Sequence, residues 1–521
     1  MDLFIKLLML LVFFGVMIYV GFYSRRHATD VNGFVLGGRS VGPWLTAFAY
    51  GTSYFSAVVF VGYAGQFGWR YGIAATWAGI ANAILGSLLA WVVLGRRTRI
   101  MTQHLDSATM PQFFEKRFQS RSLKIVASAI IFIFLIPYTA SLYNGLSRLF
   151  AMAFNIDYSV CVIVMAVLTG VYVIAGGYMA TAINDFIQGI IMLFGIVAVV
   201  LAVLRSQGGF MAALDGMARI TDSSVSDTPG VFASFFGPDP LNLLGVMILT
   251  SLGTWGLPQM VQKFYAIKNE GAISKGTVIS TFFALVVAGG CYFLGGFGRL
   301  FADRIERNAA GVPLSYDAVV PAMLSGLSPL LIALVVVLVL SASMSTLSGL
   351  VLTSSSTLTL DFLKDFQKQK MDEKRQLLVM RGLIVVFILI SVVIAIIQYR
   401  TNVTFIAQLM GVSWGALAGA FLAPFLYGLY WKRTTRIACW VSFLFSTVVM
   451  LLNIFARGSF PALLQSPINA GAFCMLAGLV LVPLVSLFTP APPAGEVERI
   501  FSCYERRVTV PVWDSIGGED V

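Results

Sequence analysis

Long apolar stretches separated by short polar segments run along most of the 521 residues. A helix needs about 20 apolar residues to cross a membrane, so this pattern predicts an all-α integral membrane protein with about thirteen transmembrane helices. We place them near residues 3–23, 43–66, 72–95, 122–152, 157–175, 180–204, 240–264, 273–300, 328–360, 378–398, 402–430, 435–456 and 469–488. The stretches that begin near 122 and 328 exceed one membrane thickness, which indicates tilted or extended helices.

The composition agrees with this pattern. The chain is 58% hydrophobic and 11% charged, whereas soluble domains carry about 25% charged residues. The five cysteines are scattered and the two histidines match no zinc motif, so we expect no cofactor and no structural metal. No GxxxxGK[ST] motif occurs, which argues against ATP-driven transport.

The net charge of +11 is carried mostly by short loops that alternate along the chain. Examples are "SRRHATD" (24–30), "GRRTR" (95–99) and "QKFYAIKNEGAISK" (262–275). Basic loops gather on the inner side of a membrane. The alternation therefore predicts a multi-pass protein of the cell membrane, with the N-terminus outside and the C-terminus cytoplasmic. It also argues against a nucleic acid partner and makes the lipid bilayer the expected surroundings.

Two of the apolar stretches are interrupted near their middle. "TAFAYGTSYFSAVVFVG" (46–62) contains glycine and serine, and "LTSLGTWGLPQMVQKF" (249–264) contains glycine and proline. Proline removes a backbone donor, and free carbonyls at membrane depth occur only where they are buried or line a cavity. Broken helices at matching positions of two halves indicate a transporter with a mid-membrane site. Close helix packing is the alternative explanation.

The stretch "SASMSTLS" (341–348) places hydroxyl groups in the middle of an apolar helix. Helical spacing puts Ala342, Ser345, Thr346 and Gly349 on one face. Hydroxyl and carbonyl oxygens suit a hard monovalent cation such as Na⁺. Alternatively, these hydroxyls bond back to their own helix or hold neighbouring helices together.

Asp185 is the only carboxylate that the sequence places within an apolar stretch. An acid at such depth is costly, so it is a functional candidate as a cation ligand, a proton relay or the partner of a hydroxyl. A hydrated position near the inner interface is the alternative. Polar and aromatic residues near the two interruptions are candidates for solute binding, although aromatic residues also serve as packing or interface anchors. They are Ser53, Tyr54, Ser56, Tyr138, Thr254, Trp255 and Gln259, together with Ser341, which is expected to face the solute.

Several motifs, taken in order, resemble the sodium:solute symporter family from about Phe34 to Tyr430. They are "FVLGGRSVGPW", "GTSYFSA", "MPQFFEKRF", "AGGYMATAINDFIQG", "GLPQMVQKF" and "MSTLSGLVLTSSSTLTLDF". The resemblance implies a leucine-transporter-like fold, with ten core helices in two inverted repeats of five. The repeats would span 43–204 and 240–430. One extra N-terminal helix (1–30), two extra C-terminal helices (435–488) and a cytoplasmic tail (489–521) would complete the chain.

The resemblance also implies a sodium site between the first and eighth core helices. Its ligands would be the carbonyls of Thr52, Phe55 and Ala342 and the hydroxyls of Ser345 and Thr346. Some members hold a second cation with the acid that matches Asp185 and two hydroxyls. Those two positions are Ser348 and Gly349 here, and the glycine offers no hydroxyl.

The solute pocket implied by the resemblance is only partly matched. Proline-transporting members carry aspartate where this chain has Tyr54, and tryptophan where it has Val58 and Thr250, whereas Tyr138 matches their pocket tyrosine. "TSYFSA" and "GLP" look closer to pantothenate-type members. We therefore expect a small organic solute, such as an amino acid or another carboxylate.

The expected function is sodium-coupled import of that solute by alternating access, for which one chain is expected to suffice. A sodium-independent facilitator or channel, or a solute sensor on the same scaffold, would be the alternatives. An embedded enzyme is disfavoured because titratable groups at depth are scarce.

Overall fold

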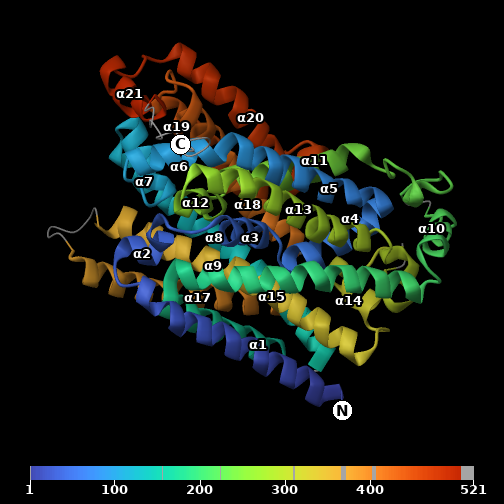
Figure 1. Cartoon of the computed structure of the whole chain (residues 1–521). Helices are drawn as coiled ribbons and strands as arrows, with labels where there is room; N and C mark the ends of the chain where they lie inside the picture. The colour runs from blue at the N-terminus through green and yellow to red at the C-terminus, as the bar shows by residue number, and fades with distance from the viewer. Residues whose placement is uncertain are drawn as a thin grey trace, which may run out of the picture.

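The computed structural model describes residues 2–154, 157–222, 225–308, 311–364, 371–401 and 406–505. Those residues form helices with short connections and three isolated β-bridges (Figure 1). The elements of the first half are α1 (Asp2–Ser24), α2 (Val31–Leu36), α3 (Pro43–Tyr54), α4 (Ala64–Tyr71), α5 (Thr76–Ala81), α6 (Arg96–His104), α7 (Met110–Phe118), α8 (Arg121–Phe154), α9 (Tyr158–Ser206) and α10 (Phe210–Ala218). Those of the second half are α11 (Pro240–Gly256), α12 (Pro258–Ala266), α13 (Glu270–Gly295), α14 (Val319–Leu324), α15 (Pro329–Thr357), α17 (Glu373–Thr401), α18 (Ile406–Tyr430), α19 (Arg436–Phe455), α20 (Pro467–Phe488) and α21 (Ala494–Phe501).

Ten segments of the described chain are long and apolar enough to cross a membrane, or eleven if the bent pair α11–α12 counts as one span. Two of the ten, Val58–His104 and Tyr158–Ser206, contain 47 and 49 residues. At about 1.5 Å per residue each exceeds twice the roughly 30 Å hydrocarbon core. Gly177, with φ 55° and ψ −145°, turns the chain within the second segment. Dividing both would give the predicted thirteen, a number that stays a prediction.

The middle of the bundle is formed by α15 and α18, whose most apolar stretches are 78% and 89% buried. α1 is only 28% buried and lies along one edge, packed on α9. α19, α20 and α21 lie at the opposite edge (Figure 1). The N-terminal helix and the two C-terminal helices are therefore peripheral, and their exposed apolar side chains suit a lipid environment.

Both predicted helix interruptions are present, and they have the same backbone geometry. The first residue after α3 is Phe55 (φ −82°, ψ 122°), and the first residue after α11 is Leu257 (φ −79°, ψ 123°). Each of these residues lies four positions after the glycine of a Gly-Thr pair, in "GTSYF" and "GTWGL". The backbone N–H of each donates to the carbonyl of its glycine, at 3.3 Å from Phe55 to Gly51 and 3.2 Å from Leu257 to Gly253.

The chain restarts differently after the two breaks. Pro258 occupies the first position of α12 and bends it by 45° from α11, a position that proline favours because it needs no donor there. Ser56 instead leads into a π-helical turn, Val58–Tyr63, that continues into α4. This correspondence of backbone and sequence supports the predicted pair of repeats.

Glycine permits direct helix contact beside the first break. A Cβ on Gly79 of α5 would lie 2.5 Å from the Cα of Gly289 in α13. The two backbones touch here, so no larger residue fits at position 79 without moving a helix.

Candidate functional site

The hydroxyls of α15 meet the first helix break. Ser345 donates from Oγ to the carbonyl oxygen of Thr52 at 2.9 Å. The Thr346 hydroxyl lies 3.3 Å from the carbonyl oxygens of both Thr52 and Phe55, and 3.1 Å from that of Ala342 in its own helix. All of these residues are buried. The structure thus brings the five residues proposed for sodium into one cluster.

The cluster consists of neutral oxygen atoms, three from carbonyls and two from hydroxyls. The Phe55 carbonyl lies at the break, which gives it a place outside the regular ladder of helix hydrogen bonds. Each hydroxyl also carries two acceptor lone pairs. A hydroxyl that turns its hydrogen away from these carbonyls can offer a lone pair to a cation beside them. This donor set suits a monovalent cation.

Ser343 also contacts the break. Its Oγ accepts a hydrogen bond from the Ala57 backbone N–H at 3.3 Å. It therefore satisfies one of the donors that the break leaves without a helical partner.

The aromatic candidates gather around a residue that sequence reasoning missed. Trp414 of α18 has its ring 5.9 Å from those of both Tyr54 and Tyr138, edge to face in each case. The Tyr54 hydroxyl lies 3.0 Å from that of Tyr292. Trp414 stands within the apolar sequence "LMGVSWGALAGA" (409–420), where nothing distinguishes it from a packing residue.

Four solute candidates carry polar atoms that make no hydrogen bond within the described residues: Ser56, Tyr138, Gln259 and Ser341. The indole N–H of Trp414 belongs to the same set. Buried polar groups are normally paired, so these groups are available to a polar solute.

The other four candidates are tied to the protein, Tyr54 through its bond to Tyr292. Thr254 donates to the Gly86 carbonyl and Trp255 to the Leu85 carbonyl, both at 2.9 Å. Ser53 donates to the Ala49 carbonyl of its own helix at 2.6 Å. A cavity of about 10 Å³ beside Tyr54 and Thr254 has no room for a solute, so the transporter is closed there in this conformation.

Asp185 is completely buried, and its neighbour is a lysine. The Nζ atom of Lys263 in α12 lies 3.6 Å from Asp185 Oδ2, and both side chains are at most 3% exposed. In the sequence, Lys263 counts among the residues of a basic loop, whereas the structure places it, buried, in α12. Its ammonium group also lies 5.2 Å from the centre of the Tyr178 ring. Ser348, the other predicted second-cation residue, donates instead to the Ser345 carbonyl at 2.8 Å.

A second buried acid, Asp361, lies just beyond the apolar stretch predicted for residues 328–360. α15 continues through a π-helical turn, Leu358–Leu363, which carries the fully buried Asp361. Its two carboxylate oxygens accept hydrogen bonds from Thr109 at 2.6 Å and Gln112 at 2.8 Å. Asp361 therefore fastens the end of α15 to the start of α7.

The first part of the predicted tail is a helix packed on the protein. Arg97 lies over the rings of Tyr430 and Tyr504, at 4.1 and 4.6 Å, and Arg117 lies 5.0 Å from the ring of Phe501. Burial lowers the pKa of Arg117 to about 10, so it remains charged at neutral pH and keeps its attraction to the ring. The tail beyond residue 505 lies outside the described residues.

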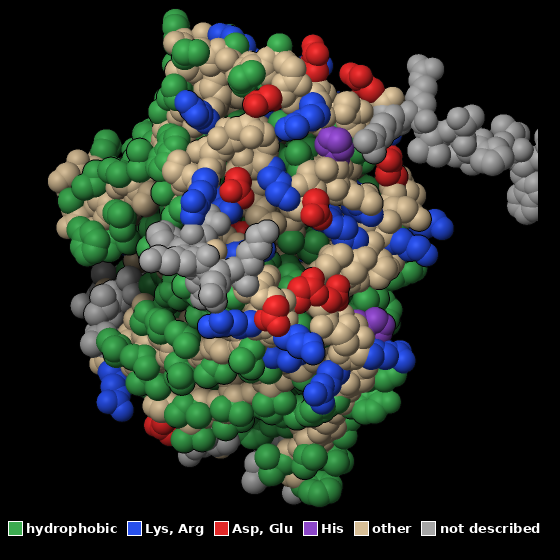
Figure 2. Space-filling view, turned by 90° about the vertical axis from the view of Figure 1, so that its left-hand side faces the viewer, with side chains coloured by type: hydrophobic (Ala, Val, Ile, Leu, Met, Phe, Trp, Pro, Cys, Tyr) green, Lys and Arg blue, Asp and Glu red, His purple; other side chains and the backbone are tan. Residues whose placement is uncertain are grey.

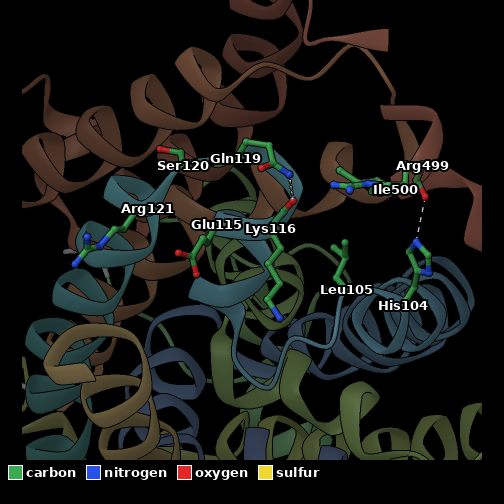
Figure 3. Close-up of a pocket in the computed structure, with 9 residues that line it drawn as sticks. All are labelled: His104, Leu105, Glu115, Lys116, Gln119, Ser120, Arg121, Arg499 and Ile500. Carbon is green, nitrogen blue, oxygen red and sulfur yellow. Dashed lines mark hydrogen bonds between the residues drawn. The ribbon is translucent and has the colours of Figure 1, made fainter. Parts of the chain in front are cut away.

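A cavity of about 510 Å³ lies between α7 and the α21 segment. His104 and Arg499 face one another across one end of it, with Nε2 of His104 3.1 Å from the Arg499 carbonyl oxygen (Figure 3). Glu115 and Lys116 lie on its other side. Glu115 is paired with Lys124 at 2.8 Å, and Lys116 donates to the Asp106 carbonyl at 2.6 Å. The charges of Glu115 and Lys116 are therefore engaged with neighbouring protein groups, and His104 is the residue that contacts the α21 segment.

A model of the sodium:solute symporter family matches residues 34–444, most of the chain. The chain belongs to the sodium:solute symporter family. It is 30% identical over 438 residues to a sodium/proline symporter of Staphylococcus aureus, covering 82% of each chain. It is 27% identical to the osmoregulated proline transporter OpuE of Bacillus subtilis, covering 95% of this chain and 97% of that one.

Among solved structures, a Na⁺-coupled sialic acid symporter in a substrate-bound outward-open state superposes with a TM-score of 0.70. The superposition covers 94% of this chain and 99% of that chain, at 16% identity. It establishes the leucine-transporter-like fold that the sequence predicted. Membership of the family makes the protein a multi-pass membrane transporter and not an enzyme.

Proposed function

We propose that this protein imports a small organic solute together with one Na⁺, which binds where α15 meets the break in α3. The observation that carries the proposal is the cluster of five neutral oxygens around Ser345 and Thr346. Sodium there joins the broken helix to α15 and stabilises one of the two access states. Its different affinity for the two states drives alternating access.

The solute site that we propose lies beside the same break, between Ser56, Tyr138 and Trp414. The Tyr138 hydroxyl lies toward the other two side chains, so their donors are gathered at one place and can turn to a polar ligand. A carboxylate accepts such bonds strongly, which supports a carboxylate-bearing solute. The residues that the family resemblance implies for proline-transporting members are absent at Tyr54, Val58 and Thr250 of this chain. Here Thr250 donates to the Val246 carbonyl and accepts from Asn82. We therefore infer that the part of the solute other than its carboxylate differs from that of proline.

We propose a single sodium ion because the second predicted cation position already contains a positive charge. Lys263 lies 3.6 Å from Asp185, and position 349 supplies no hydroxyl. We further propose that one chain suffices for transport, since both halves of the site come from the same chain. The basic face of the molecule is cytoplasmic in this proposal, which leaves the N-terminus outside.

Uptake into proteoliposomes tests the sodium site. The solute is first found by screening compounds for thermal stabilisation of the purified protein with and without Na⁺, because a coupled solute stabilises more when sodium is present. Ser345→Ala and Thr346→Val should then raise the half-saturating sodium concentration at least tenfold. Ser355→Ala is the matched control, since that buried hydroxyl on the same helix donates only to the Leu352 carbonyl.

Two results would refute the proposal. Unchanged sodium dependence in both site variants would show that the ion binds elsewhere. Uptake that equilibrates the solute without concentrating it, at any sodium gradient, would identify a facilitator instead.

A further inference from the structure

A strongly basic pocket of about 510 Å³ lies between the end of α1 and the start of α17. It is on the face of the molecule that carries many of the Lys and Arg side chains (Figure 2). The residues that line it are Arg25, Arg26, Ala28, Thr29, Lys374, Leu377 and Arg381. Four of these seven are cations and none is acidic. Asp372 and Glu373 precede Lys374 in the chain, but neither lines the pocket.

Arg381 lines this pocket, and one N–H group of its guanidinium lacks a hydrogen-bond partner within the described residues. Its Nη2 lies 3.5 Å from the Ala28 carbonyl oxygen, and its Cζ lies 5.6 Å from the centre of the Phe34 ring. Its buried Nε–H makes no hydrogen bond within the described residues. A buried donor on a cation, beside three further cations, favours an anionic ligand.

A separate apolar groove of about 290 Å³ lies between α17 and α9 and begins one helical turn beyond Arg381. On α17 it is lined by Val385, Ile388, Leu389 and Val392. These residues follow Arg381 by four, seven, eight and eleven positions, so they share its helix face. The eleven residues rise about 16 Å, roughly half of the hydrocarbon core. Gly170 of α9 keeps the groove open, since a Cβ there would lie 3.3 Å from Ile388 Cδ1.

We propose that this surface binds an anionic phospholipid, with its phosphate in the basic pocket and an acyl chain in the groove. A free phosphate compound would use the pocket but would leave the groove empty. A basic pocket at the inner end of membrane helices, followed by an apolar groove, fits the amphipathic shape of one lipid molecule. The bound lipid connects the peripheral helix α1 with α9 and α17.

Thermal unfolding of the full-length protein in neutral detergent tests this proposal. Dioleoyl phosphatidylglycerol should raise the unfolding temperature more than dioleoyl phosphatidylcholine does, and glycerol 3-phosphate should have no effect. The variant Arg25→Gln/Lys374→Gln removes two exposed charges from the pocket. The loss of each charge should lower the affinity for phosphatidylglycerol about fivefold. The double variant should therefore need roughly thirtyfold more of this lipid for the same rise in unfolding temperature.

Arg436→Gln is the matched control, because it removes an exposed charge far from this pocket in the chain and should leave the lipid response unchanged. Arg381→Gln is a second pocket variant and should behave like the double variant. Equal stabilisation by the two lipids, or an equal loss in Arg436→Gln, would overturn the proposal. A full effect of glycerol 3-phosphate would also overturn it, since the site would then bind a soluble anion.

Discussion

The buried pair of Asp185 and Lys263 allows a sharp test of how the second cation position is neutralised. Lys263→Met removes the ammonium while keeping most of the side-chain volume, and Asp185→Asn removes the carboxylate charge with little change in shape. The double variant Asp185→Asn/Lys263→Met removes both charges. If lysine is the permanent partner of the acid, each single variant leaves one charge alone in the interior, whereas the double variant leaves none.

The magnitude follows from the separation of the two groups. At 3.6 Å and an effective dielectric constant of about 20, two unit charges attract by about 4–5 kcal/mol. Removing one partner of a buried pair typically destabilises by about 3–5 kcal/mol, while replacing both is often neutral. We therefore expect each single variant to lose about 3–5 kcal/mol, and the double variant to lie within about 1–2 kcal/mol of the native protein.

The measurement is a double-mutant cycle of unfolding stability in detergent, made at low and at high sodium. A coupling energy above about 3 kcal/mol that is independent of sodium is the expected result. Additive losses would refute the reasoning, because the two charges would then act separately. So would recovery of Lys263→Met by sodium, because the carboxylate would then be serving as a ligand for a second ion.

Three further outcomes follow from the geometry. Gly79→Ala should lower the unfolding temperature, because its Cβ would lie 2.5 Å from Gly289. We expect this overpacking to cost about 1–3 kcal/mol of stability. The control Gly289→Ala should be tolerated, because its Cβ would meet nothing within 4 Å. Tyr138→Phe should weaken sodium-dependent solute binding about fivefold or more with little loss of stability, since its hydroxyl lies toward the proposed site residues Ser56 and Trp414. Tyr172→Phe, which loses a bond to the Met344 carbonyl, should cost about 1 kcal/mol of stability instead. Phe501→Ala should destabilise the protein by about 3 kcal/mol, measured by thermal unfolding, whereas unchanged stability would mean that α21 is not held by this ring.

The sequence predicted the features that depend on local chemistry. The broken helices carry glycine and proline, and the hydroxyls of α15 recur at helical spacing, so both could be recognised without knowing what lies opposite. The meeting of Ser345 and Thr346 with Thr52 and Phe55 joins distant parts of the chain. It was expected only through the resemblance to the family.

Three residues of the interior were missed from the sequence for the same physical reason. Lys263 looks like the start of a basic loop, Trp414 looks like packing, and Asp361 stands where an apolar stretch ends. In each case the decisive fact is the residue that lies opposite, and this is set by the packing of distant helices. Burial, by contrast, shows that Thr254 and Trp255 are occupied with the protein, which their position beside a helix break could not reveal.

Because Asp361 fastens the end of α15 to α7, a movement of α15 can be transmitted to α7. Ser345 and Asp361 are joined by a helix that runs without interruption into its final π-helical turn. Their separation of sixteen positions corresponds to about 24 Å along the helix. A displacement of α15 at the proposed ion site is therefore carried to Thr109 and Gln112, at the start of α7. A fluorescent label on the outer face of α7 would report ion binding from a distance, without altering any atom that touches the ion.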